Sequence, residues 1–213
     1  MAGTILCFGD SNTFGLKPSP APWTRERWAK DQRWPSVLGS LTGHEIISEG
    51  LPGRTATTVN AASPHLDAIP FIPVMMESHT PIDVVVTMLG TNDLQATLNL
   101  TPEAISLSVF RIVKSLMHSD RVLGSKPPAV LVVAPPPVEE IGFRSVTFAG
   151  ASAKSRALAP LYRDLAQSLG VGFLDAAHET AVSAADGIHL EPADHRALAR
   201  AVALQLDDLL DKR

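Results

Sequence analysis

Short apolar runs recur along the chain, separated by longer stretches of mixed polarity. Five runs stand out: TILCF at 4–8, EIIS at 45–48, DVVVTML at 83–89, AVLVVA at 129–134 and VGFLDA at 171–176. Several are continuous in Val, Ile and Leu without polar alternation, which is typical of strands buried on both faces of a parallel sheet. The runs therefore predict five strands of one buried sheet.

Three of the intervening stretches carry apolar residues at the three- and four-residue spacing of one helix face. The apolar positions are Ile105, Val109, Ile112, Val113 and Leu116 in the first, Ala157, Leu158, Leu161, Leu165 and Leu169 in the second, and Leu198, Ala201, Val202, Leu206, Leu209 and Leu210 in the third. Pro160 is expected near a helix start or at a kink. Strands that alternate with helices predict a three-layer α/β/α sandwich, although the pattern alone does not give the strand order.

Residues 17–35 stand apart from this alternation. They form a Pro-rich, charged insertion that carries all three tryptophans, Trp23, Trp28 and Trp34. A loop of this length is usually functional or interfacial. Because aromatic residues and Arg are enriched in interface cores, one interpretation is a subunit contact that narrows the entrance to a site. The other is an aromatic cluster within the same chain.

Length and composition narrow the classes of protein. The 213 residues fit one domain over 1–213, and no repeat or linker suggests a second. A net charge of −4 gives no reason to expect a nucleic-acid partner. The only cysteine, Cys7, lies in the first apolar run and is expected to be a small buried residue. No stretch approaches the ~18 apolar residues of a membrane span, so we expect a cytoplasmic protein with no membrane partner.

Polar segments follow the predicted strands, where an open parallel sheet binds its ligands. They are GDSN at 9–12, EGLPGRT at 49–55, GTND at 90–93 and, ahead of the last helix, DGIH at 186–189. Each alone is an ordinary turn or helix cap. Together they supply a nucleophile, a base, an orienting acid and oxyanion donors, which is the set that acyl transfer needs.

These four blocks, in this order and spanning nearly the whole chain, resemble those of the SGNH (GDSL) hydrolase family. Asn12 stands where many members have Leu. The segments ILCFGDS, EGLPGRT, MLGTND, the triple proline at 135–137 and DGIH resemble the bacterial arylesterase/acyltransferase subgroup more closely. The resemblance implies a flavodoxin-like five-stranded parallel sheet of order 2-1-3-4-5. It also implies hydrolysis of short acyl esters, acyl transfer to alcohols or peroxide in some members, and a homo-oligomer as large as an octamer.

The catalytic roles follow from matching the blocks. The resemblance implies that Ser11 is the nucleophile, His189 the general base and then acid, and Asp186 the residue that orients the imidazole. Asp175, directly after the fifth run, is the alternative orienting acid, but the family pattern gives that role to the Asp of DGIH.

The oxyanion hole comes from the same matching. It implies donation from the backbone N–H groups of Ser11 and Gly53 and from the side-chain amide of Asn92. Asp10 and Asp93 are expected to be structural, accepting hydrogen bonds from turn amides around the nucleophile.

Other side chains are less specific. Walls of the substrate pocket are predicted at Phe14, Pro135, Pro136, Val138, Phe143 and Phe148, with ordinary packing as the alternative. Six further histidines lie outside any such block and are expected at the surface or at helix ends: His44, His65, His79, His118, His178 and His195. The chain lacks H-E-x-x-H and any Cys/His ligand spacing, so no metal or other cofactor is expected.

The function predicted from these features is hydrolysis of short, acetyl-type carboxylic esters through an acyl-Ser11 intermediate. Its partners would be a small acyl ester and an acceptor, either water or an alcohol. A carbohydrate acetylesterase with the same mechanism is an alternative. A non-catalytic flavodoxin-like binding module is another, but neither G-x-G-x-x-G nor a phosphate-binding G-x-x-x-x-G-K-[ST] loop is present.

Overall fold

The computed structural model describes residues 2–22, 25–57, 63–118 and 126–211. Its centre is a sheet of five strands: β1 (Thr4–Gly9), β2 (Glu45–Gly50), β3 (Val84–Met88), β4 (Ala129–Ala134) and β5 (Gly172–Asp175). Every pairing is parallel, and the order is β2-β1-β3-β4-β5. The predicted fold class and the strand order implied by the family resemblance are confirmed.

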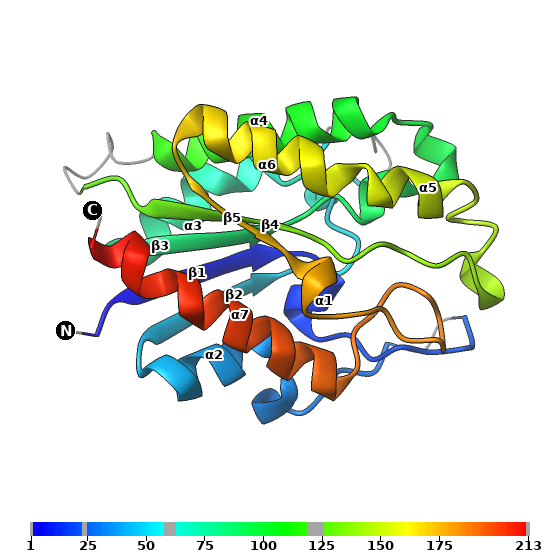
Figure 1. The fold of residues 1–213 in the computed structure, drawn as a ribbon, viewed down its shortest axis with the longest axis horizontal. Coiled ribbons are helices and arrows are strands. Elements are labelled where there is room, and N and C mark those ends of the chain that lie inside the picture. The colour runs from blue at the N-terminus through cyan, green and yellow to red at the C-terminus, as the bar shows by residue number, and fades with distance from the viewer. Residues whose placement is uncertain (1, 23–24, 58–62, 119–125, 212–213) are drawn as a thin grey trace.

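Helices cover both faces of the sheet. They are α1 (Ser11–Phe14), α2 (Trp34–Thr42), α3 (Ile72–His79), α4 (Pro102–Met117), α5 (Ala151–Arg156), α6 (Leu158–Leu169) and α7 (Pro192–Asp211). Figure 1 shows α3, α4 and α6 on one side of the sheet and α2 and α7 on the other. The three predicted helical stretches are α4, α6 and α7, and Pro160 lies in the first turn of α6.

Besides the four-residue α1, three helices escaped the sequence pattern. The helices α2, α3 and α5 contain 9, 8 and 6 residues. Two turns hold too few apolar positions for a helical period to stand out from chance. The much longer α4 shows both a period and a start signal, because Thr101 accepts a hydrogen bond from the Ala104 N–H and Pro102 occupies the first turn.

The strands divide the core into two layers. Successive residues of a strand point to opposite faces, so Leu6 and Phe8 pack under α3, α4 and α6, whereas Ile5 and Cys7 pack under α2 and α7. All four side chains are fully buried. This burial on both faces is the reason the strands read as continuous apolar runs, and it leaves polar residues only at the strand ends.

The 17–35 segment packs against its own chain. Residues Leu16 and Arg27 form an antiparallel bridge. The Trp28 indole donates to the Leu190 carbonyl at 3.1 Å, and the Trp34 side chain is buried under α7. Intrachain contacts thus account for Trp28 and Trp34, while Trp23 lies outside the described residues.

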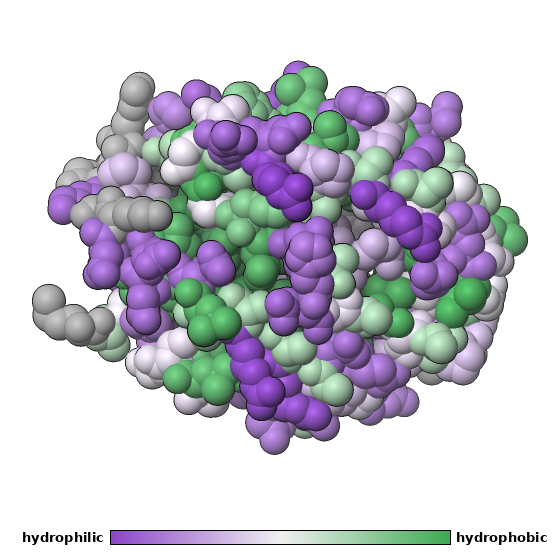
Figure 2. All heavy atoms as spheres, in the orientation of Figure 1, coloured by the Kyte–Doolittle hydropathy of each residue, from purple (hydrophilic) through white to green (hydrophobic). Residues whose placement is uncertain are grey.

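The molecular surface shown in Figure 2 mixes hydrophilic and hydrophobic residues in small patches. Among the residues that the structure describes, no helix is both long enough and apolar enough to cross a membrane.

Candidate functional site

The segments that leave the carboxyl ends of the strands meet at one rim of the sheet. The first strand ends at Gly9, Asp10 caps α1, and Ser11 is the first residue of that helix. The Asp10 carboxylate accepts the Asn12 N–H at 2.9 Å. The helix cap is therefore Asp10, which leaves the Ser11 hydroxyl free for other contacts.

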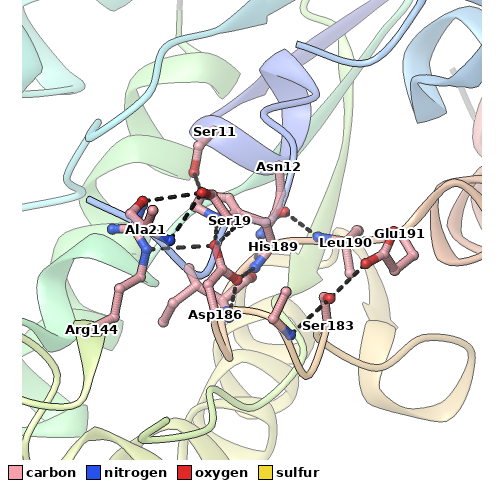
Figure 3. A network of polar contacts seen from close by, with 12 residues as sticks. Ser11, Asn12, Ser19, Ala21, Arg144, Ser183, Asp186, His189, Leu190 and Glu191 are labelled. Atoms are coloured by element: carbon pink, nitrogen blue, oxygen red, sulfur yellow. Dashed lines mark hydrogen bonds and ion pairs between the residues drawn. The ribbon is translucent and has the colours of Figure 1, made fainter. Parts of the chain in front are cut away.

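Three side chains from this rim form a continuous hydrogen-bonded chain (Figure 3). The Ser11 Oγ lies 3.0 Å from His189 Nε2, and His189 Nδ1 lies 2.6 Å from Asp186 Oδ2. All three side chains are buried. The arrangement gives a serine hydroxyl, a base within proton-transfer distance, and a carboxylate that fixes the orientation of the imidazole.

The Asp186 carboxylate is held by its own turn. Its Oδ1 accepts the backbone N–H groups of Ile188 and His189, each at 3.0 Å. Burial works to raise the pKa of Asp186, but the hydrogen bond and charge of His189, together with these two N–H donors, hold it at about 2. Asp186 is therefore ionised at neutral pH.

Two other segments reach the same carboxylate. The Ser19 N–H, from the 17–35 segment, lies 3.3 Å from Asp186 Oδ2, and Arg144 Nε lies 3.5 Å from the same oxygen. Figure 3 shows both beside Asp186. The insertion at 17–35 thus contributes to the surroundings of the acid, a role that no local sequence signal had indicated.

Asp175, the alternative orienting acid, is placed elsewhere. Its carboxylate accepts the Ala177 N–H at 3.0 Å at the start of a short 3₁₀ helix and lies 3.7 Å from His178.

Gly187 allows the DGIH turn to pack tightly. It has φ = 71°, and a Cβ there would collide with the backbone carbonyl oxygen of Glu139. The Glu139 N–H in turn donates to the Gly187 carbonyl at 2.8 Å. A side chain at 187 would force the turn away from the segment after β4 and displace Asp186 and His189 with it.

The three residues matched to the oxyanion hole, Ser11, Gly53 and Asn92, line the same space. Among the described residues, neither the Ser11 N–H nor the Gly53 N–H has an acceptor. Gly53 has φ = 88°, and the nearest group to a Cβ added there would be the flexible Leu66 side chain. Its backbone conformation, rather than crowding, is what favours glycine there. The Asn92 Nδ2 donates to the Arg54 carbonyl at 3.0 Å and lies 3.4 Å from Asp10 Oδ2.

Arg54 organises this part of the rim. Its Nη1 donates to the carbonyls of Gly9 and Glu49, so it joins the ends of β1 and β2. Burial lowers the pKa of Arg54 to about 10, against the opposing effect of Glu49 and Asp10. Sequence reasoning missed this residue, although it stands next to Gly53 in EGLPGRT.

Asn12 was also missed as a structural contact. Its amide donates to the Ile188 carbonyl and accepts the Leu190 N–H, both at 3.1 Å. These buried bonds tie the helix that carries Ser11 to the turn that carries His189, across 176 and 178 positions of sequence. The sequence feature that could have indicated this contact is the presence of Asn12 where many family members have Leu.

Asp10 and Asp93 contact turn amides, as their sequence positions had indicated. Asp93 accepts the N–H groups of Ala56 and Thr57 and the Thr57 hydroxyl. Burial raises the pKa of Asp93, and it raises that of Asp10 to about 6.

A cavity of about 410 Å³ opens onto Ser11 and His189. Its other lining residues are Leu16, Pro22, Arg25, Pro52, Gly53, Leu66, Asn92, Gln95, Phe143, Arg144, Thr147, Phe148 and Ile188. Of the six predicted wall residues, Phe143 and Phe148 line it. Phe14, Pro135, Pro136 and Val138 do not. Val138 packs in the core, and the Phe14 ring lies under the Arg27 guanidinium.

His195 lies at a helix end, as expected for the remaining histidines, but its burial was not expected. It lies in the first turn of α7 but is fully buried. Burial, with the charges of His189 and Arg33, lowers its pKa to about 4, so it is neutral at pH 7. Within the described ranges, no three His, Cys, Asp or Glu side chains are grouped so that they could hold a metal ion.

Comparison with known proteins agrees with this geometry. The native aryl esterase of M. smegmatis is 37% identical, with a TM-score of 0.94 over 98% of this chain and 100% of its own. A carbohydrate acetylesterase from Sinorhizobium meliloti is 32% identical, with a TM-score of 0.93 over 97% and 99% of the two chains. A search of curated protein sequences found no match. The model of the GDSL-like lipase/acylhydrolase family matches residues 7–197. With its Ser11–His189–Asp186 chain set at the rim of a parallel sheet, the protein belongs to the GDSL-like lipase/acylhydrolase family.

Proposed function

We propose that the protein is a serine esterase that hydrolyses short, acetyl-type carboxylic esters through an acyl-Ser11 intermediate. The observation that carries the proposal is the contact of Ser11 Oγ with His189 Nε2 at 3.0 Å, beside a cavity that Gly53 and Asn92 also line. A binding module of the same fold would need neither the contact nor the donors. The similarity to an aryl esterase and a carbohydrate acetylesterase supports the same activity.

In the first half-reaction, Ser11 Oγ attacks the ester carbonyl carbon while His189 Nε2 takes the hydroxyl proton. Negative charge develops on the carbonyl oxygen, where the N–H groups of Ser11 and Gly53 and the amide of Asn92 can stabilise it. The tetrahedral intermediate collapses, and His189 returns the proton to the departing alcohol. Asp186 stabilises the imidazolium that exists between these two transfers.

The second half-reaction regenerates the enzyme. Water, or an alcohol or peroxide as acceptor, loses a proton to His189 and attacks the acyl carbon, and Ser11 leaves with that proton. The apolar residues Phe143, Phe148 and Ile188 lie in the cavity wall. They would limit water around the acyl group and so favour transfer to an alcohol that fits between them.

The cavity favours small acyl groups. A volume of about 410 Å³ must hold both halves of the ester, and it falls near the lower end of the range for small-molecule sites. Gln95 and Thr147 add polar groups to the wall, which would suit a hydroxylated leaving group. A carbohydrate acetate is therefore the second candidate substrate, beside a simple aryl acetate.

Active-site labelling tests the proposal. A fluorophosphonate should label the folded protein, and Ser11→Ala should abolish both the labelling and the turnover of 4-nitrophenyl acetate. Ser19→Ala, which keeps the backbone N–H to Asp186, is the matched serine control and should label normally. Equal labelling of Ser11→Ala would overturn the proposal. Product analysis with aryl and sugar acetates, with and without added alcohol, separates the two substrate classes and measures transfer.

Assembly is a separate part of the proposal. A homo-oligomer, up to an octamer, in which the 17–35 segment borders the cavity entrance, would narrow that entrance further. Light scattering at assay concentration tests it, and a monomeric mass in an active sample would contradict it.

A further inference from the structure

A second cavity lies on the α2 side of the sheet, away from the catalytic one. It has a volume of about 620 Å³ and shares no lining residue with the cavity that opens onto Ser11. Its walls come from the 17–35 segment, α2 and the edge strand β2. The lining residues are Arg27, Lys30, Asp31, Arg33, Pro35, Ser36, Gly39, Ser40, His44, Ile46 and Ser48. We call this cavity the basic cleft.

The charges in the basic cleft are unbalanced. Three cationic side chains, Arg27, Lys30 and Arg33, face a single carboxylate, Asp31. Among the described residues, the ion pairs within 4.0 Å include none of these three cations. In a chain of net charge −4, such a group of unpaired cations marks a local preference for an anion.

The two arginines are held in place by the backbone. Arg27 Nε donates to the Phe14 carbonyl at 2.7 Å, and its guanidinium lies 3.8 Å from the centre of the Phe14 ring. Arg33 Nε donates to the Trp28 carbonyl at 2.8 Å. Each side chain is thus fixed through Nε, and its terminal nitrogens have no acceptor in the described part of the chain. Fixed forks of this kind lose little entropy when they bind an oxyanion.

The arginines also repel each other. Partial burial lowers the pKa of Arg27, and the charge of Arg33 lowers it further. Two like charges that are fixed near one cavity, neither in an ion pair within 4.0 Å among the described residues, are stabilised by an anion that bridges them.

From these contacts we infer that the basic cleft is a binding site for a small ligand that carries a phosphate-type oxyanion. The guanidinium groups of Arg27 and Arg33 would bind the oxyanion, Lys30 would add charge, and the hydroxyls of Ser36, Ser40 and Ser48 would hydrogen-bond the rest of the ligand. The cleft has the size of a small-molecule site, and the overall negative charge of the chain disfavours a nucleic acid.

Calorimetric titration with inorganic pyrophosphate, at constant ionic strength in chloride, tests the site. The expected result is saturable binding of one pyrophosphate per chain. Arg33→Gln should weaken binding roughly ten- to a hundredfold, since each lost charge-assisted hydrogen bond contributes about 1.5–3 kcal/mol. Arg111→Gln, on the exposed face of α4, is the matched control and should leave the affinity unchanged.

A second variant keeps the test valid if an arginine change disturbs the fold. Ser40 is exposed, and its hydroxyl bonds only the Ser36 carbonyl of its own helix. Ser40→Glu should therefore fold normally, as circular dichroism can check, and should abolish pyrophosphate binding by placing a carboxylate in the cleft. Binding that survives both Arg33→Gln and Ser40→Glu overturns the inference. An absence of pyrophosphate binding to the unchanged protein overturns it as well. If the oligomeric mass also falls in Arg33→Gln, a second copy of the chain covers the cleft instead.

Discussion

Two buried carboxylates lie on the two turns that meet at Ser11 and His189, and their pKa values are shifted in opposite directions. Asp10, after β1, is buried, and burial raises its pKa to about 6 although the Asn12 N–H and the charges of His189 and Arg54 act against it. Asp186, before α7, is also buried. There the hydrogen bond from His189 and two backbone N–H donors overcome burial and hold the pKa at about 2.

The difference lies in the donors that each turn supplies. The DGIH turn directs two N–H groups and an imidazole at Asp186, so the charged form is stabilised. The turn after β1 directs one N–H at Asp10, and the Asn92 amide stands at 3.4 Å. Burial thus does not by itself decide whether a carboxylate is ionised. A carboxylate that must balance an imidazolium needs a turn that solvates it.

The largest expected effect comes from removing the charge of Asp186. Asp186→Asn should lower kcat for 4-nitrophenyl acetate by roughly 10³–10⁴-fold, since the imidazole loses both its orienting acceptor and the charge that balances its protonated form. Asp175→Asn, the change at the alternative acid, should retain activity within about twofold. Steady-state kinetics of both variants decide between the two carboxylates, and the reverse order would refute the assignment.

Next in size is the connection between the two turns. Asn12→Ala removes both hydrogen bonds that join α1 to the segment around His189, and leaves the buried Ile188 carbonyl and Leu190 N–H without their partner. We expect a loss of about 2–4 kcal/mol in unfolding free energy, together with lower kcat as Ser11 and His189 separate. Urea unfolding measures the first quantity. Gln167→Ala on the exposed side of α6 is the control, and an equal effect there would contradict this role.

A smaller effect is expected at Asp10. Asp10→Asn would place an amide where Asn12 and Asn92 both direct donors, so one donor must face another in either orientation of the new side chain. In the orientation that opposes Asn92, the proposed oxyanion donor is displaced, so kcat should fall about tenfold, with KM little changed. Asp207→Asn on α7 is a matched exposed control. A kcat of Asp10→Asn equal to that of the control would show that Asp10 does not position Asn92.

The smallest effect is a pair of opposite pH slopes in stability. The folded pKa of Asp186, about 2, lies below its ordinary value, so the stability it contributes is present above about pH 4 and is lost as the pH falls toward 2. The folded pKa of Asp10, about 6, lies above its ordinary value, so stability is lost as the pH rises from about 4 to about 6. The unfolding free energy changes by on the order of 2 kcal/mol over each of the two pH ranges.

Denaturant unfolding from pH 2 to pH 7 separates the two slopes. Asp10→Asn should remove the decline between pH 4 and 6 and leave the acid limb. Asp186→Asn should flatten the acid limb instead. If both variants kept the profile of the natural protein, other groups would set its pH dependence.

The local pattern of apolar residues predicted much of the fold. The five apolar runs are the five strands, within two residues at each end, because burial on both faces demands continuous apolar sequence. The helices α4, α6 and α7 could be predicted because each buries one face, which places apolar residues three and four positions apart. The order of the strands came from the family resemblance, since no local residue encodes which strand pairs with which. The short helices α2 and α3 were not legible, because two turns leave too few positions to show a period.

By itself the sequence determined which residues could do chemistry: Ser11, His189, Asp186, Gly53 and Asn92 stand in blocks whose types and order point to acyl transfer. Only the tertiary structure decided which other groups support them. Asn12 bonds to residues 176 and 178 positions away, Arg54 joins two strand ends, and Ser19 and Arg144 approach Asp186 from separate segments. The residues that line the cavity and the basic cleft were likewise decided only by the tertiary structure. The physical reason is that the turn types and the apolar pattern of a strand or helix depend on a few neighbouring residues. A pocket or a long-range buried hydrogen bond depends on segments that only folding brings together.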